Sequence, residues 1–255
     1  IVGANASLLT AVAPEHMEKL LDLPTVAREE GIALSHVAQA GGNVAINMDD
    51  AWIRPHFTTI RSGKKISYSM TQLLENGLSA RISSAEDTLE VKGLAGDGKV
   101  LRFALPLPGR HNAGNLLAAI AIAHGLGLTP QEIERGMKTF RGAEGRSEVR
   151  ELPGRTTVVC DYYNASPPSM EAGFELLAQV AAKNGDPSRV RWVCLGDMLE
   201  LGEQEEQYHR SLAESLLRLK IQNVLLYGTR MRFLFDELQA RGFAGTLSHH
   251  ASHEE

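Results

Sequence analysis

The stretch LPLPGRHNAGNLLAA, residues 105–119, takes the chain from a β-like segment into a helix. Its two prolines end the preceding segment, and a Gly-Arg-His-Asn turn leads to Asn112, where an alanine- and leucine-rich helix opens. Free backbone N–H groups and the helix dipole favour anions at such a helix N-terminus. Two interpretations are open for this stretch: a nucleotide site, or a capped loop-to-helix junction whose arginine and histidine are merely solvated.

Composition limits the classes of function. The 255-residue chain is long enough for one large domain or two ordinary ones, and its formal net charge is −5. This charge gives no general attraction to nucleic acid or to an anionic membrane, so any phosphate binding must be local. No apolar run reaches the roughly 18 residues of a membrane helix, and the start lacks the basic region of a signal peptide. We therefore expect a cytoplasmic protein with no nucleic-acid partner and no membrane insertion.

Two further features concern the cysteines and the start of the chain. Cys160 and Cys194 lie in apolar strand-like runs, which favours buried thiols over a disulfide framework or a metal site. The chain begins without Met in the middle of an apolar pattern, and we expect it to be a fragment.

The part before the quoted stretch predicts a mixed α/β arrangement. A short buried strand, a turn and a helix carrying His16 come first, followed by a polar helix that ends at paired glycines. The run NVAINMDDAW, residues 43–52, predicts a strand whose carboxyl-terminal loop is acidic. Residues 58–105 predict an antiparallel patch of about three or four strands, with Asn-Gly and Gly-Asp-Gly turns. Within that patch SGKKIS is not a P-loop, because Thr58 stands where a glycine is needed and Lys65 where Ser or Thr is needed.

After the quoted stretch, Thr129-Pro130-Gln131-Glu132 predicts a capping box for a further helix. The polar, glycine-containing segment 141–155 has the composition of a hinge, and we place a domain boundary near residue 147. Strands and helices then alternate over 156–163, 166–185, 189–198, 207–219, 223–228 and 231–242. Alternation with continuously apolar strands predicts a parallel, doubly wound sheet, which binds ligands at the carboxyl ends of its strands. The histidine-containing end, residues 245–255, is expected to be a solvated tail.

Three polar sets are candidates for one site. They are GRHNAGN at 109–115, Gly145-Arg146 on the hinge, and DYYNASP at 161–167. A hinge arginine facing a strand-end aspartate and asparagine could close two lobes around a nucleotide, since it combines anion neutralisation with a hydroxyl acceptor. The alternative is that these residues are polar only because linkers between domains are polar.

These motifs, in this order, resemble those of the Mur ligases. The resemblance includes GRHN with NLLAA, then GR, then DYYNASP, then GDMLELG at 196–202. The last two, with the downstream His209, are similar to the D-alanyl-D-alanine-adding members, and GDMLELG is the most specific. Upstream, residues 10–16 are similar to the family's T-N-V-G-P-A-H, and residues 47–50 to its N-A-D-D.

The resemblance implies a partial central ATP-binding domain over 1–147, with a parallel and a small antiparallel sheet, and a truncated Rossmann-like ligase domain over 148–255. It implies ATP and Mg²⁺ as cofactors, and UDP-N-acetylmuramoyl-tripeptide and D-alanyl-D-alanine as substrates in peptidoglycan precursor synthesis. The tripeptide carboxylate would attack the γ-phosphate of ATP, and the amine of D-alanyl-D-alanine would displace the resulting acyl phosphate. Charge neutralisation and positioning are the main needs of such chemistry.

By motif match, the resemblance also implies a role for each candidate residue. His16 and Glu30 are assigned to the metal. His111, Asn112 and Asn115 are assigned to the adenine side, Arg146 to the phosphates, and Asp161 to the ribose or the hinge. Tyr163, Asn164 and His209 are assigned to the substrate side, with Arg146 and His209 as the catalytic pair.

The sequence departs from the family in two ways. It holds no glycine-rich loop ending in Gly-Lys-Thr, whose lysine and threonine would hold the phosphates and the metal. We therefore expect weak or no ATP affinity for this chain, and a non-catalytic truncated relative that acts as a binding or structural module is the rival interpretation. Glu30 also stands where the family has a carbamylated lysine, so either Glu30 supplies the metal-binding carboxylate directly or metal binding has decayed. An NAD-dependent oxidoreductase is excluded, since no strand is followed by G-x-G-x-x-G.

Overall fold

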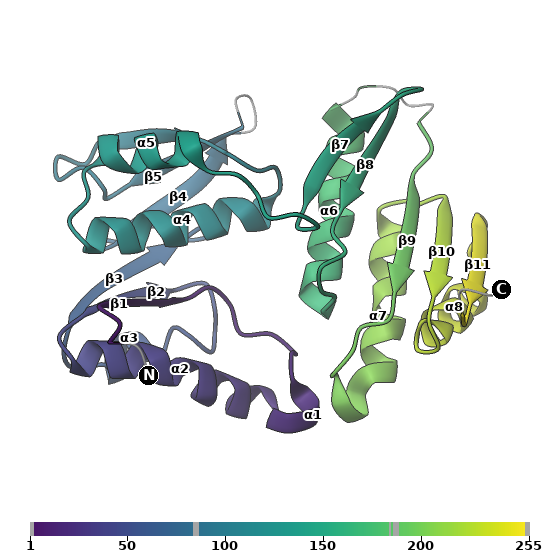
Figure 1. The fold of residues 1–255 in the computed structure, drawn as a ribbon, viewed down its shortest axis with the longest axis horizontal. Coiled ribbons are helices and arrows are strands. Elements are labelled where there is room, and N and C mark those ends of the chain that lie inside the picture. The colour runs from purple at the N-terminus through teal and green to yellow at the C-terminus, as the bar shows by residue number, and fades with distance from the viewer. Residues whose placement is uncertain (1–2, 84–86, 184, 186–188, 253–255) are drawn as a thin grey trace. The chain divides into compact units, whose positions relative to one another are not determined.

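The computed structural model describes residues 3–83, 87–183, 185 and 189–252 (Figure 1). The chain divides into two compact units. Unit 1 is formed by Ile1–Val12 and Leu23–Gly142, and unit 2 by Ala13–Asp22 and Ala143–Glu255. None of the described helices is both long enough and apolar enough to cross a membrane.

Unit 1 is built on one six-stranded mixed sheet in the order β1-β2-β3-β4-β5-β6. Its strands are β1 (Ala6–Leu9), β2 (Asn43–Asn47), β3 (Lys64–Ser69), β4 (Leu78–Ser83), β5 (Thr88–Lys92) and β6 (Val100–Ala104). The pairs from β1 to β4 are parallel, and β4, β5 and β6 are antiparallel to one another. The predicted α/β class is confirmed. One detail was wrong: β3 opens the predicted antiparallel patch but is parallel to both of its neighbours.

Helices cover both faces of the parallel part of this sheet (Figure 1). The helices of unit 1 are α2 (Leu23–Gln39), α3 (His56–Thr59), α4 (Arg110–Gly125) and α5 (Pro130–Thr139). Val44 and Ile46 of β2 pack in one core cluster with Leu34 of α2, whereas Ala45 packs in another with Leu117 of α4. Because successive strand residues point to opposite faces, α2 and α4 must cover opposite sides. The predicted capping box of α5 is confirmed, since the Thr129 hydroxyl accepts the Glu132 N–H and the Glu132 carboxylate accepts the Thr129 N–H.

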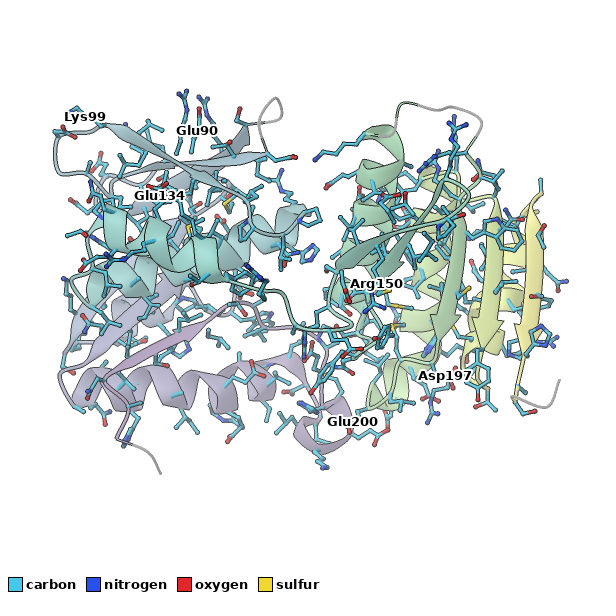
Figure 2. All side chains as sticks on the ribbon, turned by 45° about the horizontal axis from the view of Figure 1, so that its top comes forward. Glu90, Lys99, Glu134, Arg150, Asp197 and Glu200 are labelled. Atoms are coloured by element: carbon cyan, nitrogen blue, oxygen red, sulfur yellow. The ribbon has the colours of Figure 1, made fainter. Side chains whose placement is uncertain are left out.

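Glu90 lies at the centre of the antiparallel strands, directly opposite Arg81 on β4 and Arg102 on β6 (Figure 2). Arg81 Nε donates to one carboxylate oxygen at 2.7 Å, and Arg102 Nε donates to the other at 3.1 Å. These hydrogen bonds, with that of Arg81 the stronger, hold the pKa of Glu90 below its ordinary value of 4.5. The ionised carboxylate therefore links three strands of unit 1.

Replacing Glu90 with glutamine is expected to make the stability of unit 1 depend less on pH in the acid range. A carboxylate whose pKa is lowered by folding contributes stability above its ordinary value of 4.5, and this contribution is lost as pH falls through the lower folded pKa. The Tm difference between wild type and Glu90→Gln should thus be largest near neutral pH and disappear in acid. Glu134→Gln is the control, because Glu134 belongs to an exposed pair with Lys138. A Tm difference that is independent of pH would contradict the assignment.

Unit 2 contains a three-stranded parallel sheet in the order β11-β10-β9, with β9 (Trp192–Gly196), β10 (Asn223–Tyr227) and β11 (Thr246–His250). A separate antiparallel hairpin joins β7 (Glu148–Leu152) to β8 (Thr156–Cys160). The helical segments of unit 2 are α1 (Met17–Leu20), α6 (Pro167–Lys183), η1 (Gly202–Gln204), α7 (Glu205–Arg218) and α8 (Met231–Ala240). One face of α6 packs into the core through Met170, Phe174 and Leu177.

Four expectations for unit 2 were wrong in detail. The strand expected over 156–163 is not part of the parallel sheet of β9, β10 and β11, because β8 pairs antiparallel with β7 in a separate sheet. Part of the predicted hinge is strand β7, which pairs with β8 through a turn where Gly154 and Arg155 have φ of 79° and 62°. Part of the expected solvated tail is strand β11, because Leu247 packs on the core and the strand finds a parallel partner in β10. Cys194 is exposed and Cys160 is half-buried, although both thiols are free. The side chains of β9 alternate between buried and exposed, so its apolar run is covered on one face only.

Candidate functional site

The candidate site of unit 2 is a cluster at the open end of the β7–β8 hairpin. Glu148 and Cys160 are paired in this hairpin, so the residues just outside them are brought together. The Ser147 N–H donates to Asp161 Oδ1 at 3.1 Å, and the Tyr163 N–H donates to the Gly145 carbonyl at 3.1 Å. We call Gly145, Arg146, Ser147, Asp161 and Tyr163 the Arg146 cluster.

Arg146 lies with its guanidinium over the ring of Tyr163, 4.1 Å from the ring centroid. Both side chains are exposed, as are those of Asp161 and Asn164. Stacking restrains the plane of a guanidinium while its edge N–H groups still point outward, the arrangement that suits a bidentate anion such as phosphate. The structure thus brings Arg146, Asp161 and Tyr163 together within unit 2, and their roles toward a nucleotide or a substrate stay predictions.

The neighbouring backbone is shaped by Gly145, whose φ is 68°. A Cβ atom at this position would lie 2.7 Å from the ring of Tyr162. The Tyr162 hydroxyl donates to Glu144 Oε1 at 3.2 Å, and this hydrogen bond raises the pKa of Tyr162. Segment 144–147 is therefore held to segment 161–163 by side-chain and backbone contacts, which fix the position of the Arg146 backbone.

The candidate residues of unit 1 lie at the N-terminus of α4. Gly109 precedes the helix with a φ of 102°, and a Cβ there would lie 2.8 Å from the ring of His111. Asn112 Nδ2 donates to the Pro108 carbonyl at 2.7 Å, which closes the turn. His111 and Asn112 are half-buried, and Asn115 is exposed one turn further along. The amide of Asn112 thus has a structural contact, and the role of all three residues toward adenine stays a prediction.

An acidic pair that was not among the assigned site residues also lies in unit 1. Asp49 and Asp50 follow β2 after Met48, at the carboxyl edge of the parallel strands. Asp49 accepts hydrogen bonds from the hydroxyls of Ser69 and Thr71, at 2.5 and 2.6 Å. Asp50 accepts the N–H groups of Val12 and Trp52, among others.

Burial raises the pKa of Tyr68 most, and the negative charges of Asp49 and Asp50 raise it further. The sequence signal for this pair was the NMDD run, whose acids follow a strand. These hydrogen bonds make Asp49 and Asp50 the polar links that hold together the ends of β1, β2 and β3.

The two residues assigned to a metal lie in different units. His16 precedes α1 in unit 2, and its Nδ1 is 2.6 Å from Oε2 of Glu200, a pair that is largely exposed. Glu30 is half-buried on α2 of unit 1. Among the residues that the structure describes, no group of three or more His, Cys, Asp or Glu side chains could hold a metal ion.

His209 lies on α7 and is completely buried. Its Nε2 accepts the N–H of Met198 at 3.1 Å, and its Nδ1 lies 2.7 Å from the Glu205 carbonyl. Its role on the substrate side stays a prediction, and the contacts described here tie it to the GDMLELG loop.

The GDMLELG loop follows β9, and Figure 2 labels Asp197 and Glu200 on it. Asp197 accepts the N–H groups of Arg230 at 3.2 Å and Met231 at 2.8 Å, so it caps the start of α8. Gly228, with a φ of 105°, leaves room for the Asp197 carboxylate.

Comparison with known families agrees with this architecture. The family model for the Mur ligase middle domain matches residues 1–123, and that for the Mur ligase, glutamate ligase domain matches residues 145–255. The two domains together account for most of the chain. The chain belongs to the Mur ligase family, whose members are ATP-dependent amide ligases.

Among curated relatives, the chain is similar to two proteins named UDP-N-acetylmuramoyl-tripeptide--D-alanyl-D-alanine ligase. The protein from Haemophilus influenzae is 26% identical over 95% of this chain and 50% of its own length. That from Treponema pallidum is 31% identical over 82% of this chain and 42% of its own length. The chain therefore spans about half the length of these relatives.

Among solved structures, MurF from Acinetobacter baumannii has a TM-score of 0.75 at 21% identity, covering 92% of this chain and 49% of that one. MurF from Thermotoga maritima in complex with ADP has a TM-score of 0.71 at 19% identity, covering 90% of this chain and 50% of that one. At these identities the similarity establishes the fold.

Proposed function

We propose that this chain is part of an ATP-dependent amide ligase that joins D-alanyl-D-alanine to UDP-N-acetylmuramoyl-tripeptide in peptidoglycan precursor synthesis. The observation that carries the proposal is the Arg146 cluster, which presents a stacked, exposed guanidinium beside a carboxylate. The names of the curated relatives, which align with 82 to 95% of the chain, support the choice of substrates. A cytoplasmic location and the lack of a nucleic-acid partner stay predictions.

In the proposed reaction, an oxygen of the tripeptide carboxylate attacks the γ-phosphorus of ATP, and ADP leaves. The amine of D-alanyl-D-alanine then attacks the acyl carbon, loses a proton to solvent or a base, and displaces phosphate, which carries away one former carboxylate oxygen. Arg146 would neutralise charge on the transferring phosphoryl group, and Tyr163 would hold the plane of its guanidinium.

The residues present fit a nucleotide better than a metal. Asp161 uses one carboxylate oxygen for the Ser147 N–H, and its second oxygen would accept a ribose hydroxyl. His111, Asn112 and Asn115 would line the adenine side from the α4 N-terminus. The residues that the structure describes do not form a three-ligand Mg²⁺ group, so a requirement for Mg²⁺ stays a prediction.

A second candidate function is a non-catalytic module that keeps the Mur ligase fold for binding or assembly. The observation that favours this alternative is Glu30, which stands where the family resemblance implies a metal-binding carbamylated lysine.

Ligation with UDP-N-acetylmuramoyl-tripeptide, D-alanyl-D-alanine and ATP separates the two functions. It is run on this chain and on the whole open reading frame that contains it, with the product mass as the readout. Formation of the pentapeptide product by the full reading frame supports the ligase. No product and no ADP from either protein, with both folded, supports the non-catalytic module.

Replacing Tyr163 with alanine is expected to raise the KM for ATP about two- to five-fold, because an exposed cation–π contact contributes modestly to holding Arg146. Tyr163→Phe keeps the ring and should behave like wild type. Steady-state kinetics of the full reading frame checks this prediction. An equal defect in both variants would contradict a role for the ring face.

Glu30→Ala tests the two interpretations of the departure from the family lysine. If Glu30 supplies a carboxylate to the metal, the variant should need several-fold more Mg²⁺ for half-maximal ligation. Glu29→Ala is the control, since Glu29 is exposed and next to it on α2. A Mg²⁺ dependence that is unchanged in Glu30→Ala would rule out the metal role.

A further inference from the structure

His209 is a buried polar side chain on the core-facing side of α7, apart from the Arg146 cluster. Its side chain is completely buried, and it contacts the ring of Phe233 at a centroid distance of 6.4 Å. The Glu205 carbonyl can only accept, so Nδ1 carries the proton in the 2.7 Å contact. Nε2 is then free to accept the Met198 N–H at 3.1 Å. A single neutral tautomer satisfies both hydrogen bonds.

Met198 lies in the segment 197–202, called here the loop 197–202, which follows β9 and ends at the first residue of η1. Met198 and Leu201 are buried in the core of unit 2, at 0% and 1% exposure. Glu200 has a φ of 61°, a conformation that a non-glycine residue keeps only when its surroundings hold it. The hydrogen bond from Met198 to His209 joins the first half of this loop to a rigid helix.

The same loop receives the segment Ala13–Asp22, which belongs to unit 2. Met17 is buried against the position of Gly202, where an added Cβ would meet it at 3.6 Å. The Glu18 N–H lies 3.4 Å from the Glu200 carbonyl, and His16 pairs with the Glu200 carboxylate. Each of these contacts depends on the backbone path between residues 198 and 202.

We propose that His209 is a positioning residue, which fixes the loop 197–202 through the Met198 N–H and thereby docks the segment Ala13–Asp22. It acts on that segment through the loop, since its own ring contacts only α7, Met198 and Phe233 among the contacts given above. Loss of the imidazole leaves the buried Met198 N–H without its acceptor, which strains the loop conformation that holds Met17 and Glu18. The inference concerns unit 2 alone and stands whether or not the proposed ligase activity is found.

Hydrogen exchange of this chain, with no nucleotide added, tests the proposal. In His209→Leu, amides 17–21 should exchange about ten-fold faster relative to wild type, while amides of β10 keep their protection. Trypsin cleavage after Lys19 should accelerate to a similar degree. Tyr208→Phe, which changes the adjacent residue of α7 and keeps its ring, is the control and should leave both rates unchanged.

If the amides of 17–21 and of β10 exchange faster by the same factor, His209 stabilises unit 2 as a whole and the proposal is overturned. The proposal is also overturned if exchange of amides 17–21 is not accelerated. If His209→Leu does not fold, NMR of the wild-type chain tests the hydrogen bond and the tautomer of His209 directly. A hydrogen-bond scalar coupling between the Met198 amide and Nε2, in the Nδ1–H tautomer, supports the proposal. A protonated Nε2 overturns it.

Discussion

Replacing Arg146 with alanine is expected to reduce ligation by the full reading frame about a hundred-fold or more. A positioned cation on a transferring phosphoryl group typically contributes at this level. In this structure the guanidinium is restrained by the Tyr163 ring, and the backbone next to Arg146 is held by the hydrogen bond from the Ser147 N–H to Asp161. Arg146→Lys keeps the charge but loses the planar fork and the stacking, so it should recover only part of the rate.

Arg150→Ala is the matched control for Arg146. Arg150 lies on β7, four residues along the chain, and pairs with Glu148 (Figure 2). Its removal should leave the rate within about two-fold, because an exposed pair contributes little. Equal rates for Arg146→Ala and wild type would remove Arg146 from the proposed mechanism.

Replacing Gly228 with alanine is expected to lower the free energy of unfolding of unit 2 by about 2–4 kcal/mol. The estimate combines a strained positive φ with displacement of the Asp197 carboxylate from the start of α8. Gly228 has a φ of 105°, and an added Cβ would overlap the carboxylate that accepts the Arg230 and Met231 N–H groups. Chemical denaturation monitored in unit 2 measures the change.

Gly242→Ala separates the two contributions. Gly242 also has a positive φ, of 70°, but an added Cβ would meet no atom within 4 Å. Its substitution should therefore give only the conformational part, about 1 kcal/mol. Equal losses at the two glycines would mean that contact with Asp197 contributes nothing.

Local sequence patterns predicted most helices and strands, because their apolar periodicity and caps are local properties. Thr129 and Glu132 determine the start of α5 by themselves. Strands β7 and β11 were not predicted, since each becomes a strand through its partner. The charged β7 alternates weakly and is defined by its pairing with β8, and β11 is defined by the parallel edge of β10.

Sequence motifs singled out the residues of the Arg146 cluster, but they did not show how the backbone brings these residues together. Arg146, Asp161 and Tyr163 stood out as motif residues, yet β7, the first strand of the hairpin that gathers them, lay inside the segment interpreted as a hinge. His209 illustrates the opposite case. Its residue type suggested chemistry, whereas the amphipathic pattern of α7 could not reveal that the buried face would hold a backbone N–H of the loop after β9.

Oxygen transfer from the tripeptide carboxylate to phosphate distinguishes ligation through an acyl phosphate from other routes. The full reading frame is supplied with UDP-N-acetylmuramoyl-tripeptide labelled with ¹⁸O in its terminal carboxylate, D-alanyl-D-alanine and ATP. We expect one ¹⁸O atom in each phosphate released, in step with formation of the amide product. Phosphate that contains oxygen only from water and ATP would contradict ligation through an acyl phosphate.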